Sequence, residues 1–121
     1  MPISEPRYDS EIALTHISGH LSAEDAARLA TCLAEYTRCR KTPINVIIDA
    51  EHMEFMGGAA RLALADLSQK PYITTLIFIA TNPVTVQMLR SIEIMGNASH
   101  MRIVSTLREA HAQLSRYAVS K

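Results

Sequence analysis

The sequence carries no net charge, because its 12 basic and 12 acidic residues cancel. The two signs are interspersed along the chain, so no block of charge predicts a surface for nucleic acid or for an anionic membrane. No apolar run reaches the roughly 18 to 20 residues that a membrane-spanning helix requires. The opening segment, MPISEPRYDSE, is polar and acidic, unlike a signal peptide. We therefore expect a cytoplasmic protein that binds no nucleic acid and does not insert into a membrane.

Cysteine is scarce, and the two that are present, Cys32 and Cys39, lie close together in sequence. On one helix their spacing would separate them by roughly 10.5 Å of helical rise. A disulfide requires Cα atoms within about 7 Å, so the two thiols cannot bridge within the chain. Two free thiols suit a reducing compartment, and we interpret both as small helix-packing residues rather than as redox groups.

Motifs of catalysis and of metal binding are missing as well. The chain has no HExxH, CxxC or GxSxG pattern. Its histidines are His16, His20, His52, His100 and His111. Only the first two are close in sequence, and Gly19 interrupts any helix or strand that they could share. We therefore predict no catalytic residues, no metal site and no cofactor. A small enzyme built on Asp49, Glu51 and His52 is the least favoured alternative, since spacing alone cannot show converging geometry.

The composition that remains is that of one globular domain. Hydrophobic residues make up 48% of the 121 residues and charged residues 20%, which is ordinary for a folded domain of this length. There is no internal repeat and no linker. We expect residues 1–121 to form a single domain with its core over about 10–115.

Strand-like and helix-like segments alternate along the chain. A period-2 pattern predicts a strand over residues 10–17, which the segment SGHLSAED is expected to end, and β-branched runs predict buried strands over 44–49 and 73–80. A short strand is predicted over 101–104. A helix follows each strand; the expected caps are Ser22, Asn82 and Thr106, and the second helix covers residues 58–69. This order predicts an α/β fold with a mostly parallel (mixed) sheet of four to five strands and about four helices.

The junction after the second of these strands, NVIIDAEHMEFMGGAARLALADL, combines a buried strand with an unusual helix start. It reads as a strand ending at Asp49, an acidic break, a short apolar link, and then Gly57 and Gly58. Two glycines allow a tight turn and also let another backbone or a ligand approach closely, so both roles stay open. A phosphate cradle is less favoured, because MGGAAR has neither the GxGxxG pattern nor a P-loop ending.

Several segments in this order resemble the STAS family, the small domain of sulfate transporters and of bacterial anti-sigma factor antagonists. HMEFM after Asp49 resembles the apolar link into the switch helix of that family. ATNPVTVQMLRSIEIMG resembles its strand, Asn/Ser-Pro helix start and closing glycine, and MRIVSTLREAHAQL resembles its last strand and helix. The resemblance extends over most of the chain and implies a STAS-like domain that regulates transcription by binding another protein.

The sequence departs from the family at one functional position. In the antagonist branch the link is followed by Asp-Ser-Ser-Gly, where a partner kinase phosphorylates a serine; here Gly57, Gly58 and Ala59 stand in place of the Asp and the two Ser. No hydroxyl occurs between Met53 and Leu67. The resemblance therefore implies the fold and the docking surface without the phosphoswitch, and phosphorylation elsewhere is left open.

The resemblance also implies the class of partner: an anti-sigma factor, a histidine-kinase-like regulator or a larger sensor complex, with a homodimer left open. We expect the contact surface to combine the glycine turn, the outer face of the following helix and the adjoining loop. Its residues are Glu51, His52, Met56, Gly57, Gly58, Ala59, Arg61, Ala65 and Ser68. The predicted function is that of a non-enzymatic signal-transduction domain.

The alternative is a ligand-binding module of the same fold. In that hypothesis the glycine turn and exposed methionines such as Met56 line a pocket for an apolar ligand or a nucleotide, whereas Met53 and Met88 fill the core. Both hypotheses require the bend after the second buried strand to be reachable from outside.

Overall fold

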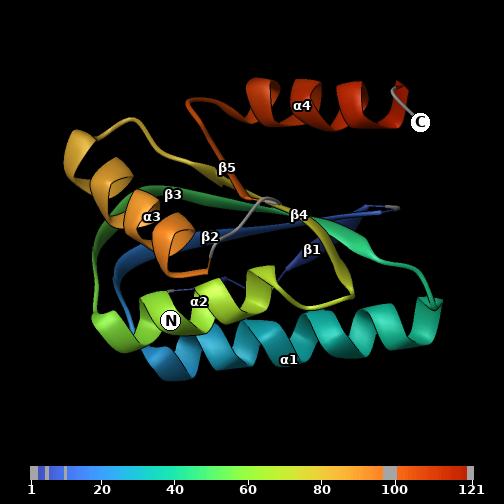
Figure 1. The fold of residues 1–121 in the computed structure, drawn as a ribbon, viewed down its shortest axis with the longest axis horizontal. Coiled ribbons are helices and arrows are strands. Elements are labelled where there is room, and N and C mark those ends of the chain that lie inside the picture. The colour runs from blue at the N-terminus through green and yellow to red at the C-terminus, as the bar shows by residue number, and fades with distance from the viewer. Residues whose placement is uncertain (1–2, 5, 10, 97–100, 120–121) are drawn as a thin grey trace.

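The computed structural model describes residues 3–4, 6–9, 11–96 and 101–119. Strands and helices alternate through this part of the chain, as the sequence predicts (Figure 1). In chain order they are β1 (Arg7–Asp9), β2 (Ile12–Leu21), α1 (Ala23–Arg40), β3 (Ile44–Met56), α2 (Gly58–Ser68), β4 (Ile73–Ile79), α3 (Pro83–Gly96), β5 (Met101–Val104) and α4 (Leu107–Val119). The predicted loop over 97–100 lies outside the described residues.

The strands form one mixed sheet in the order β1-β2-β3-β4-β5. β1 is antiparallel to β2, and every other neighbouring pair is parallel. The runs INVII and ITTLIFI supply the β-branched side chains that suit central strands covered on both faces. The prediction of a mostly parallel sheet within a single α/β domain is confirmed.

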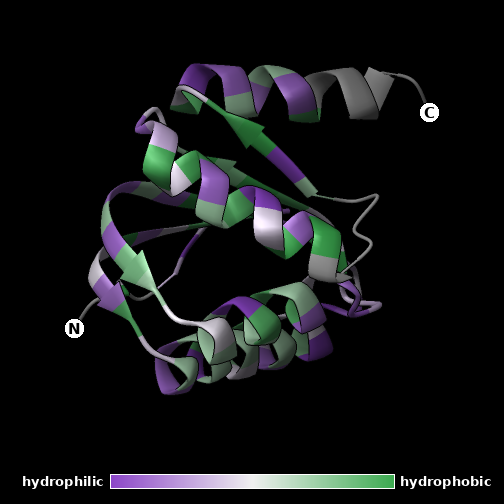
Figure 2. Ribbon diagram, turned by 60° about the vertical axis from the view of Figure 1, so that its left-hand side comes forward, coloured by the Kyte–Doolittle hydropathy of each residue, from purple (hydrophilic) through white to green (hydrophobic). Residues whose placement is uncertain are grey.

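The helices cover the two faces of the sheet unequally. α1, α2 and α3 lie on one face, and α4 lies alone on the other (Figure 1). The larger core lies under the three helices and contains Leu33, Leu64, Phe78 and Leu89. The smaller core lies under α4, where Ala110 and Leu114 belong to the same cluster as Ile47, Ile77, Ile79 and Val104. Figure 2 shows the matching pattern, with hydrophobic and hydrophilic residues alternating along the helices.

The helix starts that the sequence predicts are present. Ser22 and Asp25 form a capping box at α1, with the Ser22 hydroxyl accepting from the Asp25 N–H at 3.2 Å. The Asn82 side chain accepts from the Val84 N–H at 2.9 Å, and the Thr106 hydroxyl accepts from the Glu109 N–H at 3.1 Å. Cys32 and Cys39 are both free. No helix within the described residues is long and apolar enough to cross a membrane.

Two predicted strand ends are wrong. The segment SGHL was expected to end the first strand, but β2 continues through it to Leu21. Gly19 makes this possible, because it adopts a φ of 65° between register shifts that absorb extra backbone. The second buried strand was expected to end at Asp49, but β3 continues to Met56, so the supposed apolar link is itself strand.

Candidate partner-binding site

β2 and β3 extend together past the rest of the sheet. The pairing of β3 with β4 stops at Asp49 and Ile79, whereas its pairing with β2 continues to Leu21 and Met56. The result is a two-stranded extension that curves toward the start of α2 (Figure 1). We call residues 18–21 and 52–56 the extension. Because β2 and β3 are the only described strands in it, it has backbone edges and side chains that the central sheet would cover.

The methionines of the extension point inward. Met53 is 5% exposed and Met56 is fully buried, as part of the larger core. The prediction that Met53 and Met88 fill the core is confirmed. The prediction of an exposed Met56 is wrong, because this side chain enters the core below α1 and α2 at the end of β3. A pocket lined by exposed methionines at the glycine turn is therefore not part of this structure.

The outward side of the extension carries an aromatic contact instead. Phe55 is 49% exposed, which is unusual for a large apolar side chain. The imidazole of His20 lies 5.8 Å from its ring, measured between centroids, in a tilted arrangement. The Nε2 atom of the same histidine lies 3.6 Å from the Glu54 carboxylate. His16 and His20 therefore share a strand after all, and His20 presents a polar edge beside an exposed aromatic ring.

The glycines at the start of α2 are not required by the backbone. Gly57 is the N-cap with φ −70° and ψ 170°, an extended conformation open to any residue, and no side chain caps the helix. A Cβ atom on Gly58 would meet no atom within 4 Å, and one on Gly57 would make an ordinary contact of 3.8 Å with Phe55. Of the two roles that the sequence left open, the tight turn is not supported, and the free space above Gly58 is what an approaching molecule would use.

The exposed face of α2 differs from the predicted one. Gly58 and Ala59 are exposed, and Leu62, one turn later, is 59% exposed. Ala65 and Ser68 were expected on the outer face, but they are 2% and 1% exposed. α2 packs against α1 on one side and against α3 on the other, so its later turns are covered from three directions. Neither side chain can touch a partner in this structure.

Arg61 holds the turn in place. Its Nε donates to the Met56 carbonyl oxygen at 2.9 Å, and its Nη1 donates to the Ser91 hydroxyl of α3 at 3.3 Å. The guanidinium thus joins the end of β3, the start of α2 and the middle of α3. Arg61 was predicted as a residue that contacts the partner. In the structure it is half-buried, and its hydrogen bonds connect β3 and α3 to α2.

Glu51 and His52 lie away from the glycine turn. Both are exposed, but they are strand residues and not part of an adjoining loop. Glu51 lies six positions before Gly57, roughly 20 Å along an extended strand at about 3.3 Å per residue. The Glu51 carboxylate accepts a hydrogen bond from the Thr81 hydroxyl at 3.0 Å. The structure therefore does not bring these two residues together with the turn.

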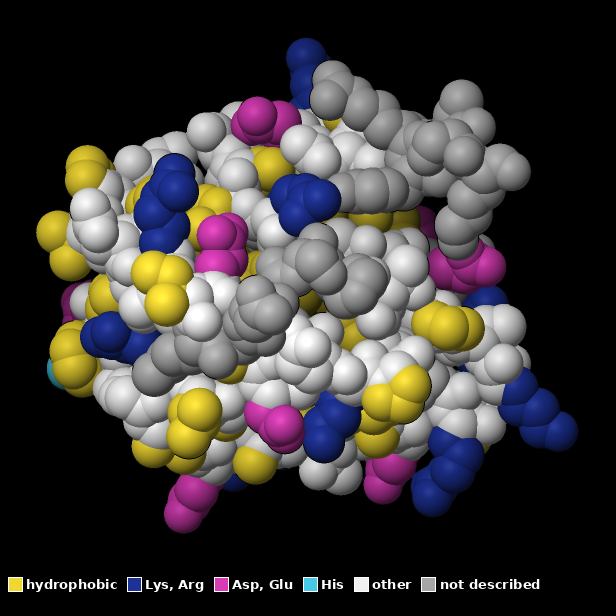
Figure 3. Space-filling view, viewed as in Figure 1, with side chains coloured by type: hydrophobic (Ala, Val, Ile, Leu, Met, Phe, Trp, Pro, Cys, Tyr) yellow, Lys and Arg dark blue, Asp and Glu magenta, His cyan; other side chains and the backbone are white. Residues whose placement is uncertain are grey.

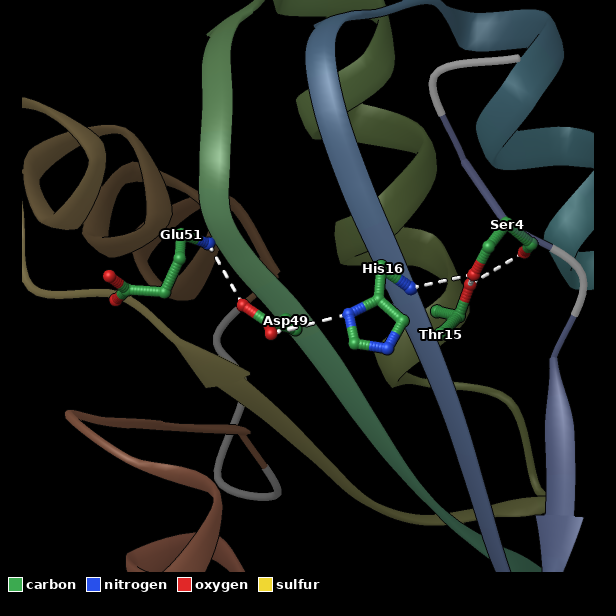
Figure 4. Close-up of polar contacts among 5 residues, drawn as sticks. All are labelled: Ser4, Thr15, His16, Asp49 and Glu51. Carbon is green, nitrogen blue, oxygen red and sulfur yellow. Dashed lines mark hydrogen bonds and ion pairs between the residues drawn. The ribbon is translucent and has the colours of Figure 1, made fainter.

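A separate polar cluster lies beside Glu51 on the sheet (Figure 4). The Asp49 carboxylate accepts from the Glu51 N–H at 3.0 Å and lies 3.2 Å from Nδ1 of His16. Ser4 and Thr15, the hydroxyls drawn beside His16, bond to each other and to backbone groups. No set of three or more His, Cys, Asp or Glu side chains in the described part of the chain is placed to hold a metal ion.

Two of the large exposed hydrophobic side chains of the described residues, Phe55 and Leu62, lie around the start of α2, and the others are on α3 and α4. Figure 3 shows hydrophobic side chains along the edge of the molecule where α2 and α3 begin. We call His20, Phe55, Gly58, Ala59 and Leu62 the rim surface. It joins the extension to the first turn of α2, because Phe55 lies beside Gly57 and Leu62 lies one turn from Gly58.

Solved structures share this arrangement of strands and helices. The chain matches an anti-sigma factor antagonist from Mycobacterium paratuberculosis with 20% identity over 92% of both chains and a TM-score of 0.64. The chain has the fold of the anti-sigma factor antagonists. It also matches an uncharacterised protein with a SpoIIAA-like fold from Shewanella loihica, with 17% identity over 93% of both chains and a TM-score of 0.66. No protein-family model and no curated protein matches the chain.

The resemblance inferred from the sequence is thus confirmed at the level of the SpoIIAA-like fold. Three members of the rim surface, His20, Phe55 and Leu62, were not among the residues predicted from the sequence. The exposure of Phe55 could not be predicted from the sequence, because Met53 and Met56 beside it are also apolar and both are buried. His20 and Phe55 come together only because Gly19 lets β2 continue beside β3.

Proposed function

We propose that this protein is a non-enzymatic, cytoplasmic regulatory domain that binds a protein partner as anti-sigma factor antagonists do. The partner class is an anti-sigma factor, a histidine-kinase-like regulator or a sensor complex. The SpoIIAA-like fold supports this class, since one of the matching structures is described as an anti-sigma factor antagonist. The contact surface is the rim surface in place of the broader set that the sequence predicted.

The observation that carries the proposal is the state of Gly58. It is exposed, its backbone conformation does not need glycine, and a Cβ would meet nothing. A glycine at a position whose backbone suits alanine costs roughly 0.4 to 1 kcal/mol, because it gives the unfolded chain more conformational freedom. The absence of a side chain at Gly58 therefore lowers stability without a steric reason. It suits a surface where the backbone of a partner lies close, between the exposed side chains of Phe55 and Leu62.

The same turn leaves backbone donors without a side-chain partner. No acidic residue lies in the first turn of α2, and no side chain caps it. The N–H groups at a helix start carry partial positive charge, which favours a carboxylate of the partner. An apolar surface with such a positive end fits a partner segment that combines apolar side chains with one acidic group.

Serine phosphorylation does not control this surface in our proposal. The first hydroxyl after the turn belongs to Ser68, which is 1% exposed and donates to the Ala65 carbonyl oxygen at 2.6 Å. A kinase cannot reach it without unfolding the end of α2. Regulation would then rest on the amount of this protein or on the state of its partner.

The test is affinity capture from the native cell with three tagged proteins: wild type, Gly58→Tyr and Ala27→Tyr. Both substituted positions are exposed on helices, but Ala27 lies on α1, outside the rim surface. We expect wild type and Ala27→Tyr to retain one regulator of the stated class, identified by mass spectrometry, and Gly58→Tyr to lose it. Retention by Gly58→Tyr at wild-type level would contradict the proposed surface.

A further inference from the structure

The open part of the α4 face holds a cavity of about 430 Å³. It lies between the edge of the sheet and α4, and it is lined by Arg7, Tyr8, Asp9, Ile12, Leu14, Ile47 and His111. Among the described residues α4 packs mainly on β3, β4 and β5, and the cavity lies toward the β1–β2 side. The volume falls in the range of roughly 300 to 1,000 Å³ that is usual for small-molecule sites.

The cavity has an apolar floor. Ile47 is fully buried, and Ile12 and Leu14 are partly buried against the smaller core. These side chains share one face because strand residues two apart point the same way. The face is opposite to the one that carries α2, so the cavity is separate from the rim surface.

The two charged residues of β1, Arg7 and Asp9, each begin a row of register partners that runs across the strands. Arg7, Leu14 and Ile47 are register partners, so one row runs from a guanidinium over two apolar side chains. It spans two strand spacings, roughly 10 Å. The neighbouring row runs from Asp9 over Ile12 to Asn45. The row over Leu14 and Ile47 is therefore apolar with the positive Arg7 at its end, and the row that ends in Asn45 has the negative Asp9 at its other end.

The polar groups of the cavity wall are available to a ligand. Neither Arg7 nor Asp9 makes an ion pair with a described residue, although they are two apart on the same strand face. The Arg7 guanidinium can hold a carboxylate with two parallel hydrogen bonds. His111 of α4 lines the opposite wall, where its ring can donate a further hydrogen bond.

We propose that this cavity binds a small amphipathic monocarboxylate. The carboxylate lies against Arg7, and the apolar chain lies over Leu14 and Ile47 below α4. The far end of an eight-carbon chain would lie over Ile47, an apolar side chain two strands from Arg7, so a second carboxylate there would lose its hydration and the site discriminates against dicarboxylates of the same length. A linear eight-carbon acid is the simplest probe, because it has one charged end and an unbranched apolar chain.

The test is a titration of the whole chain with octanoate, below its micellar concentration, followed by ¹H–¹⁵N NMR. We expect saturable shifts at Leu14, Ile47 and His111 and none at Leu62 on the rim surface. Octylamine and octanedioate should bind at least about tenfold more weakly, since the first reverses the charge that Arg7 attracts and the second places a carboxylate over the apolar Ile47. Equal binding of octylamine would overturn the proposal, as would the absence of shifts with octanoate.

Two variants separate the cavity from general apolar binding. Arg7→Gln should weaken octanoate about tenfold, while Arg90→Gln on exposed α3 should leave it unchanged. Leu14→Trp should fill the floor and abolish binding; if it fails to fold, Arg7→Gln alone decides, because Arg7 is exposed. An Arg7→Gln protein that binds octanoate like wild type would refute the assignment. Shifts at Leu14 that follow protein concentration and not octanoate would identify a self-association face and also refute it.

Discussion

Leu21 lies beside Met56 in the parallel pair of β2 and β3, beyond the point where β3 leaves β4. Both side chains are buried, at 3% and 0% exposed, so the extension is attached to the core at its far end. The residues between this anchor and the central sheet are free to present side chains outward. The rim surface depends on that arrangement, because it fixes Phe55 next to the first turn of α2.

Met56 and its neighbour Phe55 should therefore respond oppositely to truncation. Met56→Ala removes a fully buried side chain from the larger core and should lower the free energy of unfolding by about 2 to 5 kcal/mol. Phe55→Ala removes a ring that is 49% exposed and should cost less than about 1.5 kcal/mol. Urea unfolding of both variants measures the difference. Equal losses would mean that the strand does not present these two residues to opposite sides.

Replacing Gly58 with alanine should make the protein more stable. The position is helical, exposed and sterically free, so Gly58→Ala should raise the free energy of unfolding by about 0.5 to 1 kcal/mol. Gly19→Ala is the matched control, because Gly19 has a φ of 65°; it should destabilise by about 1 to 2 kcal/mol. Thermal unfolding of the pair gives both signs in one experiment. If Gly58→Ala is destabilising, the turn has a steric need for glycine that the structure does not show.

The sequence predicted the parts of this fold that local chemistry determines. The capping box at Ser22, the Asn82 cap and the β-branched strands were all found as predicted, because each is set within a few residues. The extension was missed, because His52 to Phe55 alternates polar and apolar residues over too few positions to predict a strand, and the segment pairs with β2 only in the folded structure. The strand conformation of residues 52–56 is therefore set by tertiary pairing with β2 and not by local sequence.

The candidate site was predicted in part for a similar reason. Gly58 and Ala59 were placed correctly as exposed residues at a helix start. Ala65 and Ser68 were misplaced, since small residues are equally suited to an outer face and to close helix packing, and α1 and α3 cover them. The periodicity of the sequence predicted one buried stripe on α2, but it does not indicate that α1 and α3 both pack against this helix and bury further residues.

Tyr72 should make stability sensitive to alkaline pH. Burial raises the pKa of its hydroxyl above the ordinary value of 10.0; Lys70 opposes the shift and Asp66 adds to it. The folded protein holds this proton to higher pH than the unfolded chain does, so the stabilisation is complete below pH 10 and is lost as the pH rises through the folded pKa. Urea midpoints at pH 8 and above pH 10 should fall less steeply in Tyr72→Phe than in wild type. Identical slopes would show that Tyr72 does not contribute.

Arg61 should determine how firmly the rim surface is held. Its guanidinium bonds the Met56 carbonyl oxygen and the Ser91 hydroxyl, which lie on β3 and α3. Arg61→Gln should lower the free energy of unfolding by about 1 to 2 kcal/mol and speed amide hydrogen exchange at Gly58 and Ala59. Arg61→Lys should not rescue either value, because a point charge cannot reproduce the fork that reaches both acceptors. Arg90→Gln, on the exposed side of α3, should change neither. Full rescue by lysine would show that the positive charge at position 61 is sufficient to hold the turn. The pair of hydrogen bonds would then not be what shapes the rim surface, and packing between α2 and α3 would take that role.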